Sequence, residues 1–149
     1  MKKIPLGTTD ITLSRMGLGT WAIGGGPAWN GDLDQQICID TILEAHRCGI
    51  NLIDTAPGYN FGNSEVIVGQ ALKKLPREQV VVETKCGIVW ERKGSLFNKV
   101  GDRQLYKNLS PESIREEVEA SLQRLGIDYI DIYMTHWQSV PPFFTPIAE

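Results

Sequence analysis

The sequence has no long hydrophobic segment, few cysteines and no excess of positive charge, and each absence excludes a class of protein. No run approaches the ~18 consecutive apolar residues that a membrane-spanning helix needs, so we expect no membrane partner. The residues after Lys2-Lys3 lack the apolar segment of a secretion signal, so we expect no export. A net charge of −3 argues against nucleic acid as the main partner.

The cysteine content indicates a reducing compartment. Cys38, Cys48 and Cys86 are odd in number and lack the paired spacing of a metal site. Such a pattern is typical of free thiols in a cytoplasm, which is where we expect the protein to act. The chain has 149 residues, 42% of them hydrophobic, which is enough for a core and favours a single domain.

Short apolar runs alternate along the chain with segments that carry helix start and stop signals. A β-hairpin is predicted first, from Lys3–Leu6 and Ile11–Leu13. The later predicted strands are 16–19, 51–54, 80–85 and 130–134. The predicted helices run from Asp32 or Asp34 to Cys48, from Asn63 to about Leu75, and from Ser110 to Leu125. This alternation predicts an α/β fold with parallel strands and right-handed helical crossovers.

Helical periodicity also predicts which side chains face the sheet. These are Val68, Ala71, Leu72 and Leu75 in the second helix, and Ile114, Val118, Leu122 and Leu125 in the third. We expect Asn63-Ser64-Glu65 to supply a cap and a favourable acid at the start of the second helix. No clear period appears between Gly87 and Asn108, and a connection of that length is usually functional or mobile. Residues 146–149 resemble the opening turn of a fourth helix.

Chemically active side chains follow three successive predicted strands. Asp54 ends the second strand, with Tyr59 just beyond on a turn, Lys85 ends the third, and His136 follows the fourth. The carboxyl ends of parallel strands meet at one edge of a sheet, where ligands bind. Each residue alone has an ordinary structural explanation, such as a turn-capping aspartate or a core histidine. Their repetition at successive strand ends favours one shared site.

The residue types suit proton donation to a carbonyl oxygen. A phenol has an ordinary pKa of about 10, and a neighbouring ammonium favours its ionised form. Lys85 would supply that charge to Tyr59, Asp54 would hold the lysine in place, and His136 would donate a hydrogen bond to the substrate oxygen. A metal site fits poorly, because these four side chains do not form a usual zinc or iron ligand set.

A second motif, near the N-terminus, is similar to a dinucleotide-binding site. Gly17-Leu18-Gly19-Thr20-Trp21-Ala22 matches the G-x-G-x-x-A pattern of dinucleotide-binding folds. In those folds a helix begins at once with its N-terminus on the pyrophosphate, whereas here Gly24-Gly25-Gly26-Pro27 intervenes. We interpret the match as accidental. We expect the glycines instead to allow close approach to a ligand, with Trp21 as a wall of the pocket.

In these motifs the chain resembles the aldo-keto reductases. The resemblance is carried by 17–21, by 54–59 with 63–65, by 83–85 and by 133–137, and it extends over essentially the whole chain. It implies that residues 1–149 are a single partial domain, the N-terminal part of a (β/α)₈ TIM barrel whose bottom is closed by the hairpin. It also implies reduction of an aldehyde or ketone, such as a small 2-oxoaldehyde, by NADPH or NADH.

The resemblance assigns roles to individual residues. Tyr59 matches the proton donor, Lys85 and Asp54 the pair that tunes it, and His136 the residue that orients the carbonyl. Gly19 and Thr20, with Asp54, match the nicotinamide contacts. Trp21 and Trp137, with Tyr59 and His136, are expected to line the substrate pocket.

The length departs from the family pattern. Such barrels have ~250 residues or more, so we expect a fragment that ends inside the fourth helix and has little activity by itself. Its two open sheet edges would allow oligomers. The family also includes barrels that serve as regulatory subunits, so a non-catalytic, cofactor-binding module is the alternative.

Overall fold

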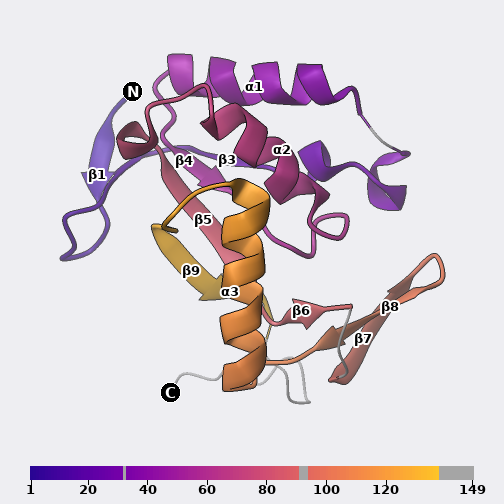
Figure 1. The fold of residues 1–149 in the computed structure, drawn as a ribbon. Coiled ribbons are helices and arrows are strands. Elements are labelled where there is room, and N and C mark those ends of the chain that lie inside the picture. The colour runs from indigo at the N-terminus through magenta and orange to yellow at the C-terminus, as the bar shows by residue number, and fades with distance from the viewer. Residues whose placement is uncertain (32, 91–93, 138–149) are drawn as a thin grey trace.

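A parallel four-stranded sheet forms the centre of the molecule. The structure is a computed structural model and describes residues 1–31, 33–90 and 94–137. The sheet has the strand order β3-β4-β5-β9 (Figure 1). Its strands are Gly17–Gly19, Leu52–Asp54, Val81–Cys86 and Ile132–Thr135. All three neighbouring pairs are parallel, as the sequence predicts.

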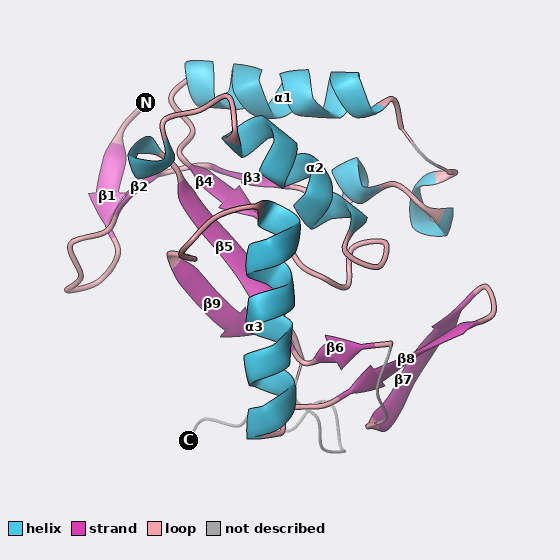
Figure 2. Ribbon diagram, in the orientation of Figure 1, coloured by secondary structure: helices cyan, strands magenta, loops and turns pink. Residues whose placement is uncertain are grey.

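Three helices cover one face of this sheet (Figures 1 and 2). They are α1 (Gln35–Arg47), α2 (Asn63–Leu72) and α3 (Pro111–Leu125). The side chains between the two layers form the hydrophobic core, which includes Ile42, Ile53, Val68, Val82 and Leu125. Burial of apolar surface between sheet and helices therefore holds the sheet edge with the predicted site in one orientation.

Local signals set the ends of two helices. The Asp34 carboxylate accepts a hydrogen bond from the Ile37 backbone N–H and caps α1, whereas Asp32, the alternative cap, lies outside the described residues. Ser110 caps α3, and Gly126 ends it with a φ of 65°.

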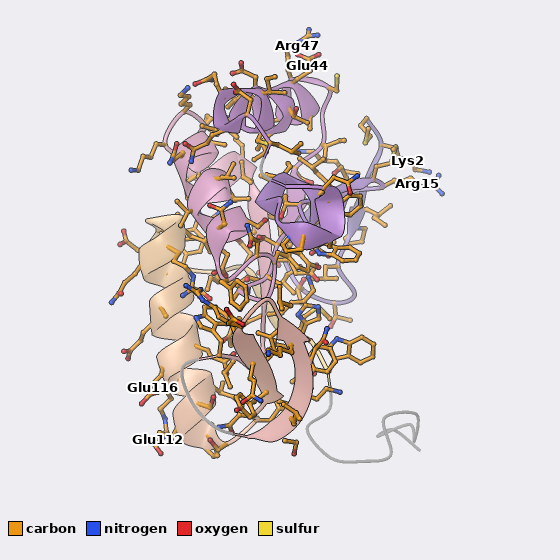
Figure 3. The ribbon with its side chains drawn as sticks, turned by 90° about the vertical axis from the view of Figure 1, so that its right-hand side faces the viewer. Lys2, Arg15, Glu44, Arg47, Glu112 and Glu116 are labelled. Atoms are coloured by element: carbon orange, nitrogen blue, oxygen red, sulfur yellow. The ribbon has the colours of Figure 1, made fainter. Side chains whose placement is uncertain are left out.

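Figure 3 shows Glu44 and Arg47 together at the outer surface of α1, away from the sheet. The fourth helix predicted at 146–149 also lies outside the described residues.

The N-terminal hairpin is attached to the amino ends of the strands. β1 (Lys3–Pro5) and β2 (Thr12–Ser14) pair antiparallel, as predicted. Asn51, just before β4, accepts a hydrogen bond from the Ser14 backbone N–H at 2.6 Å and donates to the Thr12 carbonyl at 2.8 Å. The hairpin therefore covers the end of the sheet opposite to the predicted site.

The region between Gly87 and Asn108 contains structure that the sequence analysis did not predict. β6 (Ile88–Val89), β7 (Ser95–Val100) and β8 (Arg103–Lys107) form a separate antiparallel sheet with the order β6-β8-β7. Figure 2 shows it beyond the carboxyl ends of the parallel strands. The missed signal is the pair Gly101-Asp102, a two-residue hairpin turn whose glycine has a φ of 59°.

Two predictions about the helices were wrong in part. As predicted, α2 begins at Asn63 and carries Glu65 in its first turn, but Asn63 is not its cap. Gly62 caps α2 with a φ of 86°, and the Asn63 side chain instead donates to the Gly24 carbonyl. In α3 the predicted apolar stripe is only half-buried apart from Leu125, and the fully buried line is Ser113, Glu117 and Ser121. The buried line of the third helix is therefore mostly polar, and Glu117 accepts a hydrogen bond from the Gly87 backbone N–H at 2.9 Å, while Leu125 joins the hydrophobic core. Among the described residues, no helix is long and apolar enough to span a membrane.

Candidate active site

The four predicted catalytic side chains lie together beyond the carboxyl ends of the strands. Asp54 is the last residue of β4, Lys85 lies in β5, and His136 follows β9. Lys85 Nζ lies 2.5 Å from Asp54 Oδ1 and 3.2 Å from Tyr59 Oη. The Tyr59 and His136 rings meet edge to face with their centroids 5.6 Å apart. One site therefore contains the acid, the phenol, the amine and the imidazole.

The hydrogen-bond pattern of Lys85 determines which atom carries the available proton. An ammonium has three N–H donors and no acceptor. The three acceptors around Lys85 are Asp54 Oδ1, Tyr59 Oη and, at 2.9 Å, the Thr55 carbonyl. Because Tyr59 Oη accepts a hydrogen bond from Lys85, its own O–H remains free to donate elsewhere. The phenol is thus arranged as a proton donor.

The turn that carries Tyr59 is shaped by its neighbours. The Tyr59 backbone N–H donates to the Ala56 carbonyl at 3.1 Å. Asn60 and Phe61 both have positive φ values, 52° and 53°, which is uncommon for residues other than glycine. The Asn60 side chain donates to the Gly24 carbonyl at 2.9 Å and offsets part of this strain. The loop is therefore held in an unfavourable backbone conformation that directs Tyr59 toward Lys85.

The glycine-rich loop packs against the Tyr59 turn. A Cβ at Gly24 would lie 3.1 Å from the Tyr59 carbonyl oxygen, and one at Gly26 would lie 2.9 Å from the Asn60 side chain. These two glycines therefore allow close approach of another protein segment. No α-helix begins directly after β3, because α1 starts only at Gln35. The G-x-G-x-x-A match therefore does not have the structure of a dinucleotide motif.

Electrostatic interactions hold Lys85 charged and His136 neutral. Burial alone would lower the pKa of Lys85, but its hydrogen bonds to Asp54 and Tyr59 and the charge of Asp54 raise it above its ordinary value. Burial, together with the Lys85 charge, lowers the pKa of His136 to about 4. Burial and the Asp54 charge raise the pKa of Glu83, the neighbour of Asp54 across the sheet. At neutral pH the imidazole is therefore an uncharged hydrogen-bonding group beside an ammonium.

A cavity of about 680 Å³ opens over Tyr59 and His136. Trp21 and Trp137, both predicted to line the pocket, contribute to its wall and are 52% and 43% exposed. Phe97 and Leu105 come from β7 and β8, the sheet that the sequence analysis missed. The Gly101-Asp102 turn was the available signal for this second wall.

The residues predicted to contact a cofactor lie in different surroundings. Gly19 is exposed at the end of β3, and a Cβ built on it would meet no atom within 4 Å. Thr20 is fully buried, and its hydroxyl donates to the Asp54 carbonyl at 2.8 Å. The Thr20 side chain therefore supports the backbone of Asp54, while Gly19 and the Asp54 carboxylate, which is 35% exposed, face open space.

The arrangement can protonate an oxygen atom placed in the cavity. The phenol supplies the proton, the lysine stabilises the negative charge that the phenol acquires, and the neutral imidazole is in position to donate a hydrogen bond. Over residues 1–31, 33–90 and 94–137, no group of three or more His, Cys, Asp or Glu side chains is placed to hold a metal ion.

Comparisons of this chain with known protein families and with individual relatives all indicate one family. The sequence model of the Aldo/keto reductase family matches residues 15–144. The chain is 99% identical over all its 149 residues to an NADH-specific methylglyoxal reductase of Escherichia coli, and it covers 46% of that protein. It is 45% identical to an aldo-keto reductase of Bacillus subtilis, of which it covers 41%. The chain therefore spans less than half the length of these relatives.

Solved structures agree with this result. A glycerol dehydrogenase of Gluconobacter oxydans superimposes with a TM-score of 0.73 at 40% identity, over 91% of this chain and 39% of the other. The holo form of an aldo-keto reductase of Bacillus halodurans gives a TM-score of 0.72 at 35% identity, over 90% of this chain and 40% of the other. Both neighbours are (β/α)₈ barrels, and the four parallel strands described above form the N-terminal part of such a barrel.

Proposed function

Because the chain belongs to the aldo/keto reductase family, we propose that the whole protein reduces a small aldehyde or ketone to an alcohol. The observation that carries this proposal is the hydrogen bond from Lys85 Nζ to Tyr59 Oη at 3.2 Å, with Asp54 on the other side of the ammonium. This contact leaves the phenolic proton directed to an outside acceptor. The family relationship gives that acceptor its identity, a carbonyl oxygen that becomes an alkoxide.

Each residue of the cluster has one task in this reaction. Tyr59 donates the proton to the carbonyl oxygen. Lys85 stabilises the phenolate that remains, and Asp54 keeps the ammonium in position and charged. His136 donates a hydrogen bond to the same oxygen and orients the carbonyl, which it does as a neutral imidazole since its pKa is about 4. Trp21 and Trp137 enclose the substrate beside the Tyr59 ring.

A nicotinamide cofactor, when bound, supplies the hydride that reaches the carbonyl carbon. The residues present fit its nicotinamide end: Gly19 leaves open space where a side chain would stand, and the Asp54 carboxylate borders that space. Thr20 contributes by holding the Asp54 backbone. We place the adenine end of the cofactor outside the described residues.

The relatives suggest the substrate and the cofactor. The Escherichia coli protein is named an NADH-specific methylglyoxal reductase, whereas a structure from Klebsiella pneumoniae, with a TM-score of 0.64 and 28% identity, is a complex with NADPH. At 99% identity the first comparison weighs more. We therefore propose NADH as the cofactor and a 2-oxoaldehyde such as methylglyoxal as the substrate. The free thiols favour a cytoplasmic enzyme.

Cofactor turnover tests the proposal. The protein to use carries residues 1–149 followed by the C-terminal part of the Escherichia coli relative, and it is mixed with NADH and methylglyoxal. We expect steady consumption of NADH, with one alcohol formed for each NADH oxidised, and slower consumption of NADPH. If NADH binds but no carbonyl compound is reduced, the protein is a cofactor-binding regulatory module and the reductase proposal is wrong.

A further inference from the structure

Three fully buried hydroxyl groups meet behind the active site. Ser64 Oγ, in the first turn of α2, lies 2.7 Å from Thr20 Oγ1 and 3.0 Å from Thr55 Oγ1. It also donates to the Thr20 carbonyl at 2.9 Å. All three side chains have zero exposure. A buried hydroxyl is costly unless it is hydrogen-bonded, so this cluster is a specific arrangement rather than a filled space.

The protons of the cluster can be assigned. Thr20 Oγ1 donates to the Asp54 carbonyl at 2.8 Å, so its single proton is in use. The proton of Ser64 is then shared between the Thr20 carbonyl and Thr20 Oγ1, and Thr55 donates to Ser64. Ser64 is therefore the one residue through which the other two hydroxyls are connected. Removing its hydroxyl leaves the Thr55 proton and the Thr20 carbonyl without these partners.

The cluster holds the backbone that positions Lys85. Thr20 fixes the carbonyl of Asp54 through both its backbone N–H, at 2.9 Å, and its hydroxyl. The carbonyl of Thr55 accepts a hydrogen bond from Lys85 Nζ. The backbone N–H of Ser64 donates to the Tyr59 carbonyl at 3.3 Å. Ser64 thus contacts the segments that carry the acid, the phenol and the backbone acceptor of the ammonium.

The ordinary explanation of a serine near a helix start does not apply here. A capping serine precedes the helix and accepts a hydrogen bond from a backbone N–H one turn ahead. The cap of α2 is Gly62, which has no side chain, and no hydrogen bond joins Ser64 Oγ to a backbone N–H of α2 among the bonds described. The Ser64 hydroxyl instead points out of its own helix, toward the ends of β3 and β4.

We propose that Ser64 is a positioning residue for the reduction. Its hydroxyl acts through its contacts with Thr20 and with the Thr55 side chain. These two residues hold the backbone of Asp54 and Thr55, which keeps the Lys85 ammonium within hydrogen-bonding distance of Tyr59. The inference rests on the proposed function for its kinetic consequence, while the structural relationship stands on the contacts alone. Ser64 touches neither substrate nor cofactor, so its effect is on the proton-transfer geometry and not on binding.

Kinetics of Ser64→Ala in the whole protein test the proposal. We expect kcat to fall by between about tenfold and about a hundredfold, the size that a small misplacement of catalytic groups produces. The KM for NADH should change by less than about twofold. With NADH deuterated at the transferred position, the isotope effect on kcat should rise because the chemical step becomes slower. Thr55→Val, which removes one hydrogen bond of the cluster without loss of volume, should give a smaller effect of the same kind.

Two comparisons separate positioning from simple loss of stability. Ser121→Ala removes another fully buried hydroxyl, which contacts Arg124 and not the active site, and it should leave kcat and the isotope effect unchanged. In an Asp54→Asn background, Ser64→Ala should cost less than about threefold, because the ion pair that it positions is already gone. Equal costs in both backgrounds, or an unchanged kcat in Ser64→Ala, would overturn the proposal.

Crystal structures supply a readout that does not depend on activity. In Ser64→Ala the hydrogen bond of 2.9 Å from Lys85 Nζ to the Thr55 carbonyl should be lost, with Lys85 farther from Tyr59. A Lys85 that keeps all three acceptors would contradict the inference. If the unsubstituted protein reduces no carbonyl compound, the proposed function fails by itself, and this structural comparison still decides the role of Ser64.

Discussion

At the residue scale, the proposed chemistry depends on which acceptors take the three N–H groups of the Lys85 ammonium. Its three N–H donors meet a carboxylate, a backbone carbonyl and a phenolic oxygen, so the ammonium is fully hydrogen-bonded although it is only 9% exposed. This arrangement keeps the charge in a buried position without leaving a donor unsatisfied. It also determines the direction of the Tyr59 proton, which is the property that a carbonyl reductase needs.

His136 gives a prediction about pH. Its pKa of about 4 in the folded protein lies below the unfolded value of about 6.5. Between these values the unfolded chain binds a proton that the folded chain does not, so stability falls as the pH is lowered from about 6.5 to 4. The loss from this group should be at most about 3.5 kcal/mol, because one pKa unit corresponds to about 1.4 kcal/mol and the pKa differs by about 2.5 between the two states.

Two measurements check this prediction. The carbon-bound imidazole protons of His136 should keep constant NMR chemical shifts down to about pH 5. In urea unfolding, the difference in stability between pH 7 and pH 4.5 should be smaller for His136→Asn than for the unsubstituted protein. A titration of His136 with a midpoint near 6.5 would mean that the imidazole is charged at mildly acidic pH. It would contradict the proposal that His136 acts as a neutral hydrogen-bond donor.

The sequence predicted the residues of the site more completely than it predicted the structure around them. Asp54, Lys85 and His136 each follow an apolar run, and parallel strands bring such positions together whatever the details of packing. Thr20 shows the limit of this reasoning. The sequence places it beside Gly19 at a strand end, but successive strand residues point to opposite faces, and the turn decides which side chain is buried. The hydroxyl cluster around Ser64 also depends on which side chains the turns bury, and the sequence does not show this.

At the element scale, the contact between α2 and α3 combines close packing with a buried ion pair. A Cβ at Gly69 would lie 2.5 Å from the Leu125 carbonyl oxygen, so the two helices approach as closely as glycine allows. The carboxylate of Glu65, which has zero exposure, accepts hydrogen bonds of 2.6 Å from both Arg124 Nε and Thr84 Oγ1. This interface holds both helices on the strand that carries Lys85.

Gly69→Ala tests the close packing. Glycine inside a helix is about 1 kcal/mol less favourable than alanine, so this change would stabilise an isolated helix. Here the steric clash with a backbone oxygen should outweigh that gain and destabilise the protein by about 1–3 kcal/mol. The measurement is the midpoint of denaturant unfolding, with Gln70→Ala in the same helix as the control. A stabilised Gly69→Ala protein would show that the helices lie farther apart than described.

Arg124→Met tests the ion pair. Removing one partner leaves the Glu65 charge buried, which should cost about 2–3 kcal/mol of unfolding free energy, less than for a completely buried pair because Arg124 is 23% exposed. The matched control is Arg47→Met. Arg47 pairs with Glu44 at the surface of α1 (Figure 3), and such exposed pairs contribute little. Equal losses of stability in the two variants would contradict the account.

The elements themselves were predicted unevenly, for physical reasons. Apolar runs and helix start and stop signals identified every parallel strand and the three long helices, although the cap predicted for α2 was wrong, because those signals are local. The inner face of α3 was misjudged, since Ser113, Glu117 and Ser121 are buried through hydrogen bonds that periodicity of apolar residues does not reveal. β7 and β8 were missed because their apolar and polar residues do not alternate regularly, and because β8 buries the charged side chain of Lys107 as well as Leu105.

At the scale of the whole molecule, the described sheet has two outer strands, β3 and β9, and one uncovered face. Met134 of β9 is 44% exposed. Because the relatives are more than twice as long, the remaining strands of the barrel would pair with these edges. We propose that completion of the barrel would also complete the cofactor site, with Gly19 and Asp54 of this chain at its nicotinamide end.

The isolated 149-residue chain should consequently bind NADH weakly. We expect no saturation at micromolar NADH in a fluorescence titration, whereas the protein completed with the C-terminal part of the Escherichia coli relative should saturate in that range. Sedimentation of the same samples would show whether the chain associates through its open edges. Micromolar binding by a monomer of the short chain would contradict the view that the missing strands hold most of the cofactor.

The central claim is that Tyr59 donates the proton to the carbonyl oxygen, and Tyr59→Phe in the completed protein tests it most directly. This change removes one oxygen atom and leaves Gly19, Asp54 and Lys85 unaltered. We predict that kcat for methylglyoxal falls by a factor of 10²–10⁴, the usual contribution of a general acid, while the dissociation constant for NADH stays within about threefold. Retention of most of the activity in Tyr59→Phe would contradict the assignment.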